Sequence, residues 1–127
     1  MALMNEEELS GIYGTLRKLL HEQRSGVIRN IAGEAGFDLG MLPDGKTDSG
    51  SGIQREPILT AMDGMWSTFP DDRKERTLRR FAEALAPEVG IKNPPQDGAV
   101  ERGIGLINER IRKHGFKIEN GVFVPVD

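Results

Sequence analysis

Residues 6–21 read EEELSGIYGTLRKLLH, and this stretch indicates what kind of fold to expect. Its apolar side chains stand at positions 9, 12, 13, 16, 19 and 20, the spacing of a single helix face. Glutamates occupy the first turn, and Arg17 and Lys18 lie toward the end, as the helix dipole favours. A helix with one apolar stripe has to cover that stripe with other elements. The stretch therefore predicts a helix packed within a larger helical assembly.

Two shorter stretches continue this pattern. Residues 25–35 read SGVIRNIAGEA; Ser25 suits the N-cap position, and Gly36 suits a left-handed stop. A third helix is expected to begin near Pro57, because proline is tolerated in a first turn. The apolar side of that helix contains the single tryptophan, Trp66. These segments predict a second and a third helix that share a core with the first.

A fourth and a fifth helix follow. Residues 71–86 carry an apolar stripe that includes Leu78 and Phe81, and Pro87 is expected to end the helix. The fifth helix is predicted over residues 97–114. Its core stripe is Val100, Ile104, Ile107 and Ile111, with a half-buried His114 at its end. Glycines at positions 103 and 105 should each cost ~1 kcal/mol relative to alanine, so tertiary packing must hold this helix together.

The C-terminal residues 116–126 read FKIENGVFVPV. The dipeptide Asn120-Gly121 between two β-branched and aromatic runs is a strong hairpin signal, because both turn residues tolerate a positive φ. A lone two-stranded hairpin is marginally stable in water. Its apolar face is therefore expected to dock on the helices.

Residues 36–52 (GFDLGMLPDGKTDSGSG) are rich in glycine, aspartate and serine, and we expect a flexible loop there. Within it, GMLPDGKT at residues 40–47 satisfies the P-loop pattern letter by letter. A phosphate-binding P-loop needs a buried strand before it and a helix after it, and the flanking residues predict neither. We therefore interpret these residues as a Pro-Asp-Gly turn.

These segments predict one domain over residues 1–127: a mainly α, five-helix bundle with a C-terminal β-hairpin. Its expected core is Leu16, Leu20, Ile31, Leu59, Met62, Trp66, Phe81, Leu85, Ile104, Ile107, Ile111 and Phe123.

The composition excludes several classes of protein. Lys and Arg total 17 against 20 Asp and Glu, so the net charge is -3, which does not suit a polybasic tail. Without cysteine and with only two histidines, we expect no disulfide, metal site or cofactor. No carboxylate pair or nucleophile stands in a catalytic pattern, so no catalytic residue is assigned and no enzyme is expected. No segment suggests a membrane helix or secretory signal, so a cytoplasmic location is expected.

The fourth helix carries the clearest candidate binding surface. With the apolar stripe turned inward, Arg73, Arg76 and Arg80 gather on the opposite face. A solvated surface with i,i+4 ion pairs is the ordinary interpretation of such a face. The functional interpretation is contact with an anionic partner, either an acidic protein surface or a nucleic acid.

The order of the last elements also allows a winged-helix domain that binds nucleic acid. Helices 71–86 and 97–114 would form the helical pair, and residues 116–126 would form the wing. In this alternative, the residues away from the core stripe would touch the partner: Arg102, Leu106 and Lys113 on the second helix and Lys117 in the wing.

Four stretches between Ile12 and Pro87 carry a resemblance: IYGTLRKLL, SGVIRNIAGEAGFDL, REPILTAMDGM and DDRKERTLRRFAEAL. Their order resembles the small helical accessory domains, death-domain-like or abortive-infection-associated, of bacterial anti-phage defence proteins. The ending GLINERIRKHGFKIENG is similar to the helix-then-hairpin ends of abortive-infection proteins. Such domains recruit or oligomerise and perform no catalysis. The resemblance implies a non-enzymatic adaptor in bacterial defence or regulation, with a protein partner or self-association.

Overall fold

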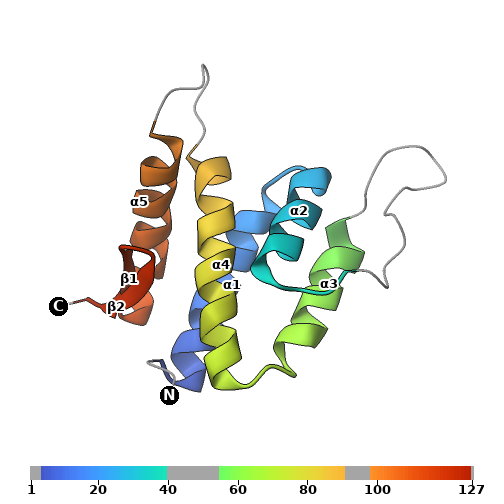
Figure 1. Ribbon diagram of the computed structural model, residues 1–127, viewed down its shortest axis with the longest axis horizontal. Helices are drawn as coiled ribbons and strands as arrows, with labels where there is room; N and C mark the ends of the chain where they lie inside the picture. Colours follow the sequence, from blue (N-terminus) through green and yellow to red (C-terminus); the bar gives the residue numbers. More distant parts are fainter. Residues whose placement is uncertain (1–3, 40–54, 91–97, 127) are drawn as a thin grey trace.

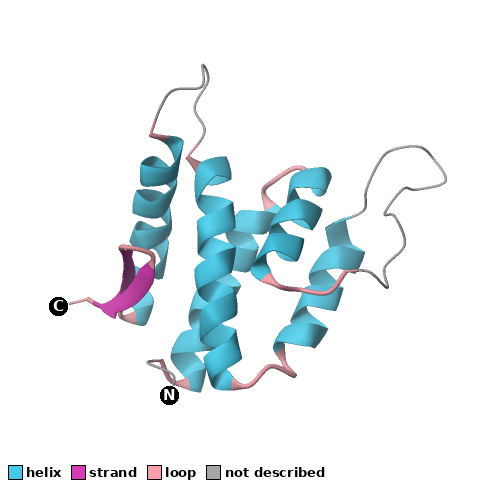
Figure 2. Cartoon of the chain, viewed as in Figure 1, coloured by secondary structure: helices cyan, strands magenta, loops and turns pink. Residues whose placement is uncertain are grey.

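The computed structural model describes residues 4–39, 55–90 and 98–126 (Figure 1). Helices pack together in this part of the chain and a two-stranded hairpin follows them, which confirms the predicted mainly helical fold (Figure 2). The elements are α1 (Glu6–His21), α2 (Ser25–Ala35), α3 (Arg55–Trp66), α4 (Asp71–Val89), α5 (Ala99–Ile111), the 3-10 turn η1 (Arg112–His114), β1 (Phe116–Glu119) and β2 (Val122–Pro125). No helix in these three ranges is both long and apolar enough to span a bilayer.

Helix α4 lies at the centre of the bundle, because α1, α2 and α5 all pack on it. Figure 1 shows α2 and α5 on opposite sides of α4. The side chains of Leu78, Phe81 and Leu85 are fully buried, as their spacing predicted. Burying apolar area is worth roughly 25 cal/mol per Å², so these three side chains stabilise the contacts of α4 with its neighbours.

Helix α1 forms as its sequence predicted. Asn5 and Glu8 make a reciprocal cap: the Glu8 amide donates to Asn5 Oδ1 (2.8 Å), and the Asn5 amide donates to Glu8 Oε1 (2.9 Å). All six apolar positions of the predicted stripe are buried. Local capping and long-range burial therefore favour the same boundaries for this helix.

Helix α2 begins one residue differently from the prediction. Its N-cap is Arg24, since the Ile28 amide donates to the Arg24 carbonyl (2.9 Å), and Ser25 is already helical. Gly36 ends the helix with a φ of 109°, as predicted. The amides of Gly36 and Phe37 donate to the carbonyls of Gly33 and Ala32, which is the Schellman pattern.

The loop predicted over residues 36–52 is only partly a loop of surface residues. Phe37 and Leu39 belong to the buried core, with 3% and 8% of their surface exposed. Their burial follows from the turn at Gly36, which directs the chain back across the bundle. Residues 40–52 of this loop, including the P-loop-like 40–47, lie outside the described residues.

The prediction that Pro87 ends the fourth helix was wrong, because α4 continues to Val89. A proline removes one amide donor, and near a C-terminus the lost bond leaves an exposed carbonyl that water can satisfy. The last turn is held by packing instead. Ala86 and Gly90 lie directly against Gly103 and Ala99 of α5.

Helix α5 and η1 cover residues 99–114, whereas Asp97, at the start of the predicted fifth helix, lies outside the described residues. Gly103, Ile107 and Ile111 form its buried side. Two predicted core positions differ, since Ile104 is only partly buried and Val100 is 49% exposed. The reason is Gly103: its missing side chain brings α5 onto α4 along a line one position away from the predicted stripe.

The hairpin has the predicted two-residue turn, with positive φ at Asn120 (53°) and Gly121 (80°). Ile118 pairs with Phe123, and both side chains are buried. Asn108 of α5 covers the edge of β1, because its side-chain amide both donates to and accepts from the backbone of Ile118 (3.1 and 2.6 Å). An exposed strand edge is a site for unwanted pairing, and this contact occupies part of that edge.

Polar contacts that the sequence did not predict tie the first helix to the rest. The Tyr13 hydroxyl donates to Asp63 Oδ1 (2.7 Å), and Arg17 Nε donates to both carboxylate oxygens (2.9 and 3.1 Å). The Tyr13 ring stacks on Trp66, with centroids 4.3 Å apart. Lys74 lies buried over the Trp66 ring and donates to Glu6 Oε1 (3.0 Å). This contact lowers the pKa of Glu6.

The buried phenol of Tyr13 leads us to expect a loss of stability at alkaline pH. Burial, with the hydrogen bond to Asp63, raises the pKa of its phenol, so the folded state keeps the proton where the unfolded chain releases it. The stabilising effect is complete below the ordinary phenol pKa of about 10 and declines as the pH rises above it. Urea unfolding of wild type and Tyr13→Phe from neutral pH to about pH 11 checks this. The difference between their midpoints should shrink with rising pH; a constant difference would contradict the prediction.

Candidate anion-binding site

The three arginines predicted on one face of α4 do lie together. Arg73, Arg76 and Arg80 are exposed and line one hollow of about 210 Å³. Thr77 of the same helix and Ala35 and Gly36 at the end of α2 complete its lining. The hollow therefore lies where the C-terminal end of α2 meets the middle of α4.

Arg73 is positioned by an aromatic side chain. Its guanidinium lies over the ring of Phe69, 4.0 Å from the centroid. Phe69 in turn stacks against Phe37, with centroids 5.8 Å apart. Because Phe37 follows Gly36 directly, the same turn that ends α2 also supports this arginine.

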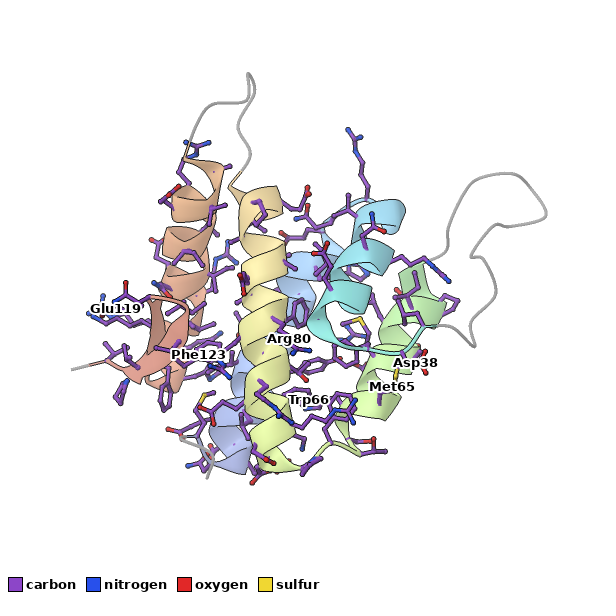
Figure 3. All side chains as sticks on the ribbon, in the orientation of Figure 1. Asp38, Met65, Trp66, Arg80, Glu119 and Phe123 are labelled. Carbon is purple, nitrogen blue, oxygen red and sulfur yellow. The ribbon has the colours of Figure 1, made fainter. Side chains whose placement is uncertain are left out.

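Arg80 extends from α4 toward α2 (Figure 3). Its Nη1 would lie 3.9 Å from a Cβ atom on Gly36. The C-terminal end of a helix carries partial negative charge, which favours a guanidinium at this place. Glu34 and Glu83 line a neighbouring hollow with Arg80. Within the described residues, however, neither Arg76 nor Arg80 forms an ion pair or hydrogen bond.

Thr77 is the residue of this site that sequence reasoning missed. It is 4% exposed, and its hydroxyl has no hydrogen-bond partner among residues 4–39, 55–90 and 98–126. No fully inaccessible side-chain oxygen in the same ranges lacks a partner, so the Thr77 hydroxyl opens onto the hollow. Its position one residue before Leu78 in the buried stripe was the signal that could have placed it on the inner side of the arginines.

This arrangement suits an anion. Three guanidinium groups supply charge and planar pairs of donors, and a hydroxyl supplies one more donor from the floor. Gly36 contributes no side chain, so the backbone leaves the space open. The hollow contains no acidic lining residue among the described ones. An incoming carboxylate or phosphate would therefore meet cations first.

The remaining predicted binding residues lie on the α5 side of α4. Arg102 Nε donates to the carbonyl of Gly90 (2.9 Å), so it caps the end of α4. Leu106, predicted to be exposed, is partly buried and packs against the core. Lys113 is exposed in η1, and Lys117 is exposed in β1 with Glu119 Oε2 3.4 Å from its Nζ. The structure does not bring these four residues to the arginine hollow.

The other chemical candidates carry packing contacts. His114 is half-buried against Gly11, as predicted, and its Nε2 lies 3.2 Å from Thr15 Oγ1. Burial, with Lys113 nearby, lowers the pKa of His114. His21 lies 3.3 Å from Glu56 Oε1 on α3. In the ranges that the structure describes, no three His, Asp or Glu side chains come close enough to hold a metal ion.

Comparison with family models, with curated proteins and with solved structures finds no match to this chain. The site is therefore interpreted from its own geometry and charge.

Proposed function

We propose that this chain is a non-enzymatic protein-interaction module that binds an acidic partner through Arg73, Arg76 and Arg80. One observation carries the proposal. These three exposed guanidiniums border a single hollow, and Arg76 and Arg80 have no ion-pair partner within the described residues. The setting that the resemblance suggests, bacterial anti-phage defence or regulation, stays a prediction.

The charge distribution supports this proposal. The whole chain carries a net charge of -3, so a cationic face on it is a local feature. Such a face steers an acidic partner and sets the rate and orientation of its approach more than the final affinity. Exposed charge contacts are also screened within ~10 Å at 0.1 M salt. Binding through this face should therefore weaken strongly as salt is added.

The test measures binding of a labelled polyglutamate peptide by fluorescence anisotropy at low and moderate salt. We expect the variant R73Q/R76Q/R80Q to bind at least about tenfold more weakly than wild type at low salt. A matched control, R110Q/R112Q/K113Q, removes three exposed cations from α5 and η1. If the control weakens binding as much as the first variant, the arginine face is not the binding surface.

The winged-helix alternative finds less support in the geometry. In a helix-turn-helix motif the two helices cross at about 90–120° after a short turn. Here α4 and α5 run antiparallel, side by side, and α5 buries Gly103, Ile107 and Ile111 (Figure 1). The same anisotropy assay with labelled duplex DNA compares the two. Tighter binding of duplex DNA than of polyglutamate, lost on changing Arg102, Lys113 and Lys117, would favour the alternative.

A further inference from the structure

We infer that the arginine hollow is built for one phosphate group, carried on a phosphorylated serine or threonine side chain of the acidic partner. The inference rests on the proposed function and names the chemistry that the same site would recognise. It depends on Thr77, at the floor of the hollow, rather than only on the three arginines that form its rim.

The hollow has one nearly buried polar side chain among its described lining residues, Thr77. Thr77 is 4% exposed, and within the described residues its hydroxyl donates to nothing and accepts from nothing. Because no fully inaccessible side-chain oxygen in the described ranges lacks a partner, the Thr77 hydroxyl opens onto the hollow and is available to whatever occupies it. By contrast, Thr15, which also faces inward on a helix, bonds the Gly11 carbonyl (3.0 Å). A ligand oxygen in the hollow could therefore accept from the Thr77 hydroxyl.

The charge of the hollow matches a phosphate monoester better than a carboxylate. A phosphorylated side chain carries about -1.5 to -2 charge near neutral pH and three acceptor oxygens. The hollow offers guanidiniums from Arg73, Arg76 and Arg80 around the Thr77 hydroxyl. A carboxylate has two acceptor oxygens in one plane and a single charge, so it satisfies fewer of these donors than a phosphate does. Clusters of arginine are a recurrent means of recognising phosphorylated peptides.

The size of the hollow indicates a single group. Its volume of about 210 Å³ is below the ~300–1,000 Å³ of pockets that enclose small molecules. Gly36, with a φ of 109° and no side chain, leaves the wall next to Arg80 open. A phosphate would therefore enter while the rest of its peptide lies across α4 and the end of α2.

Neighbouring negative charge restricts where the phosphate can sit. Glu34 and Glu83 border Arg80 on its far side, and the carbonyls ending α2 face the same region. These groups repel an anion that moves past Arg80. The phosphate should accordingly lie toward Arg73, Arg76 and Thr77, where no carboxylate lines the hollow among the described residues.

The experiment compares three versions of one acidic peptide with serine, glutamate or phosphoserine at its centre, measured by titration calorimetry. We expect the phosphoserine peptide to bind wild type about tenfold or more tighter than the glutamate peptide. Thr77→Val should remove most of that preference, because valine keeps the shape and loses the hydroxyl, and should weaken the phosphoserine peptide more than the glutamate peptide. Thr77→Ser, which keeps a hydroxyl, should keep the preference for the phosphoserine peptide. Thr60→Val, at an exposed position of α3, is the matched control.

The outcomes separate this inference from the function on which it rests. Equal affinity for the glutamate and phosphoserine peptides, or an undiminished preference in Thr77→Val, overturns the inference and leaves the acidic-partner proposal standing. If no version binds but inorganic phosphate shifts the amide resonances of Gly36 and Thr77 more than acetate does, the acidic-partner proposal fails and the phosphate site remains. Tighter binding of duplex DNA than of the phosphoserine peptide through these arginines overturns both. Thermal unfolding of each variant confirms that the fold is retained.

Discussion

Replacing Gly103 by alanine is expected to lower the free energy of unfolding by about 3 kcal/mol, whereas the same change at Gly105 should raise it by ~0.5–1 kcal/mol. Both glycines lie inside α5, two positions apart. A Cβ on Gly103 would fall onto the carbonyl of Ala86, which is backbone and cannot rotate away. A Cβ on Gly105 would meet nothing within 4 Å.

The opposite signs follow from the two terms that a glycine substitution changes. Alanine always restricts the unfolded chain and favours the helix, which gains stability where there is room. At Gly103 the gain is outweighed, because α4 and α5 would have to separate along their contact. Urea unfolding of the two single variants, followed by circular dichroism, measures both effects. If both variants lose the same free energy of unfolding, the close contact of α4 and α5 at Gly103 is contradicted.

The second large effect is expected at Phe81, which is fully buried in the middle of α4. Phe81→Ala should cost about 3–5 kcal/mol, since it removes the ring and leaves a cavity that the bundle cannot close. The ring also packs edge-on against Tyr13, with centroids 6.2 Å apart. The contact links α4 to the cluster of Tyr13 and Trp66, so the loss is felt on α1 and α3 as well.

A chemical unfolding curve of Phe81→Ala against wild type gives this value directly. Phe81→Leu keeps most of the volume and should lose less than half as much stability. Val122→Ala, at a position that is 40% exposed, serves as the surface control and should change stability by less than about 0.5 kcal/mol. If Phe81→Ala falls within that same small range, Phe81 is not at the centre of the core.

The elements most accessible to sequence reasoning were those with strong local signals. The stripe of residues 6–21, the stop at Gly36 and the Asn120-Gly121 turn all stand where they were predicted. In each case the local preference of the backbone and the long-range burial of side chains agree. Pro87 and Ile104 differ because packing of α4 on α5 outweighs a local rule.

The candidate site shows the same division. Periodicity placed Arg73, Arg76 and Arg80 on one face of a helix, which requires only residues within that helix. Thr77 was overlooked because its role depends on whether a neighbouring group bonds its hydroxyl. That is decided by the elements packed around it and not by the sequence of α4. Likewise, no periodicity distinguishes Arg102, which caps α4, from an arginine that faces a partner.

Residue spacing along the chain thus predicts the helical class, the number of helices and the arginine face of α4. It can do so because helices and turns form from residues close together in the sequence. The neighbours of each helix, the use of Gly103 as a contact and the hollow between α2 and α4 are decided only when distant segments meet. Such contacts depend on shape at the scale of single atoms, where a missing methyl group or an unpaired hydroxyl changes the result.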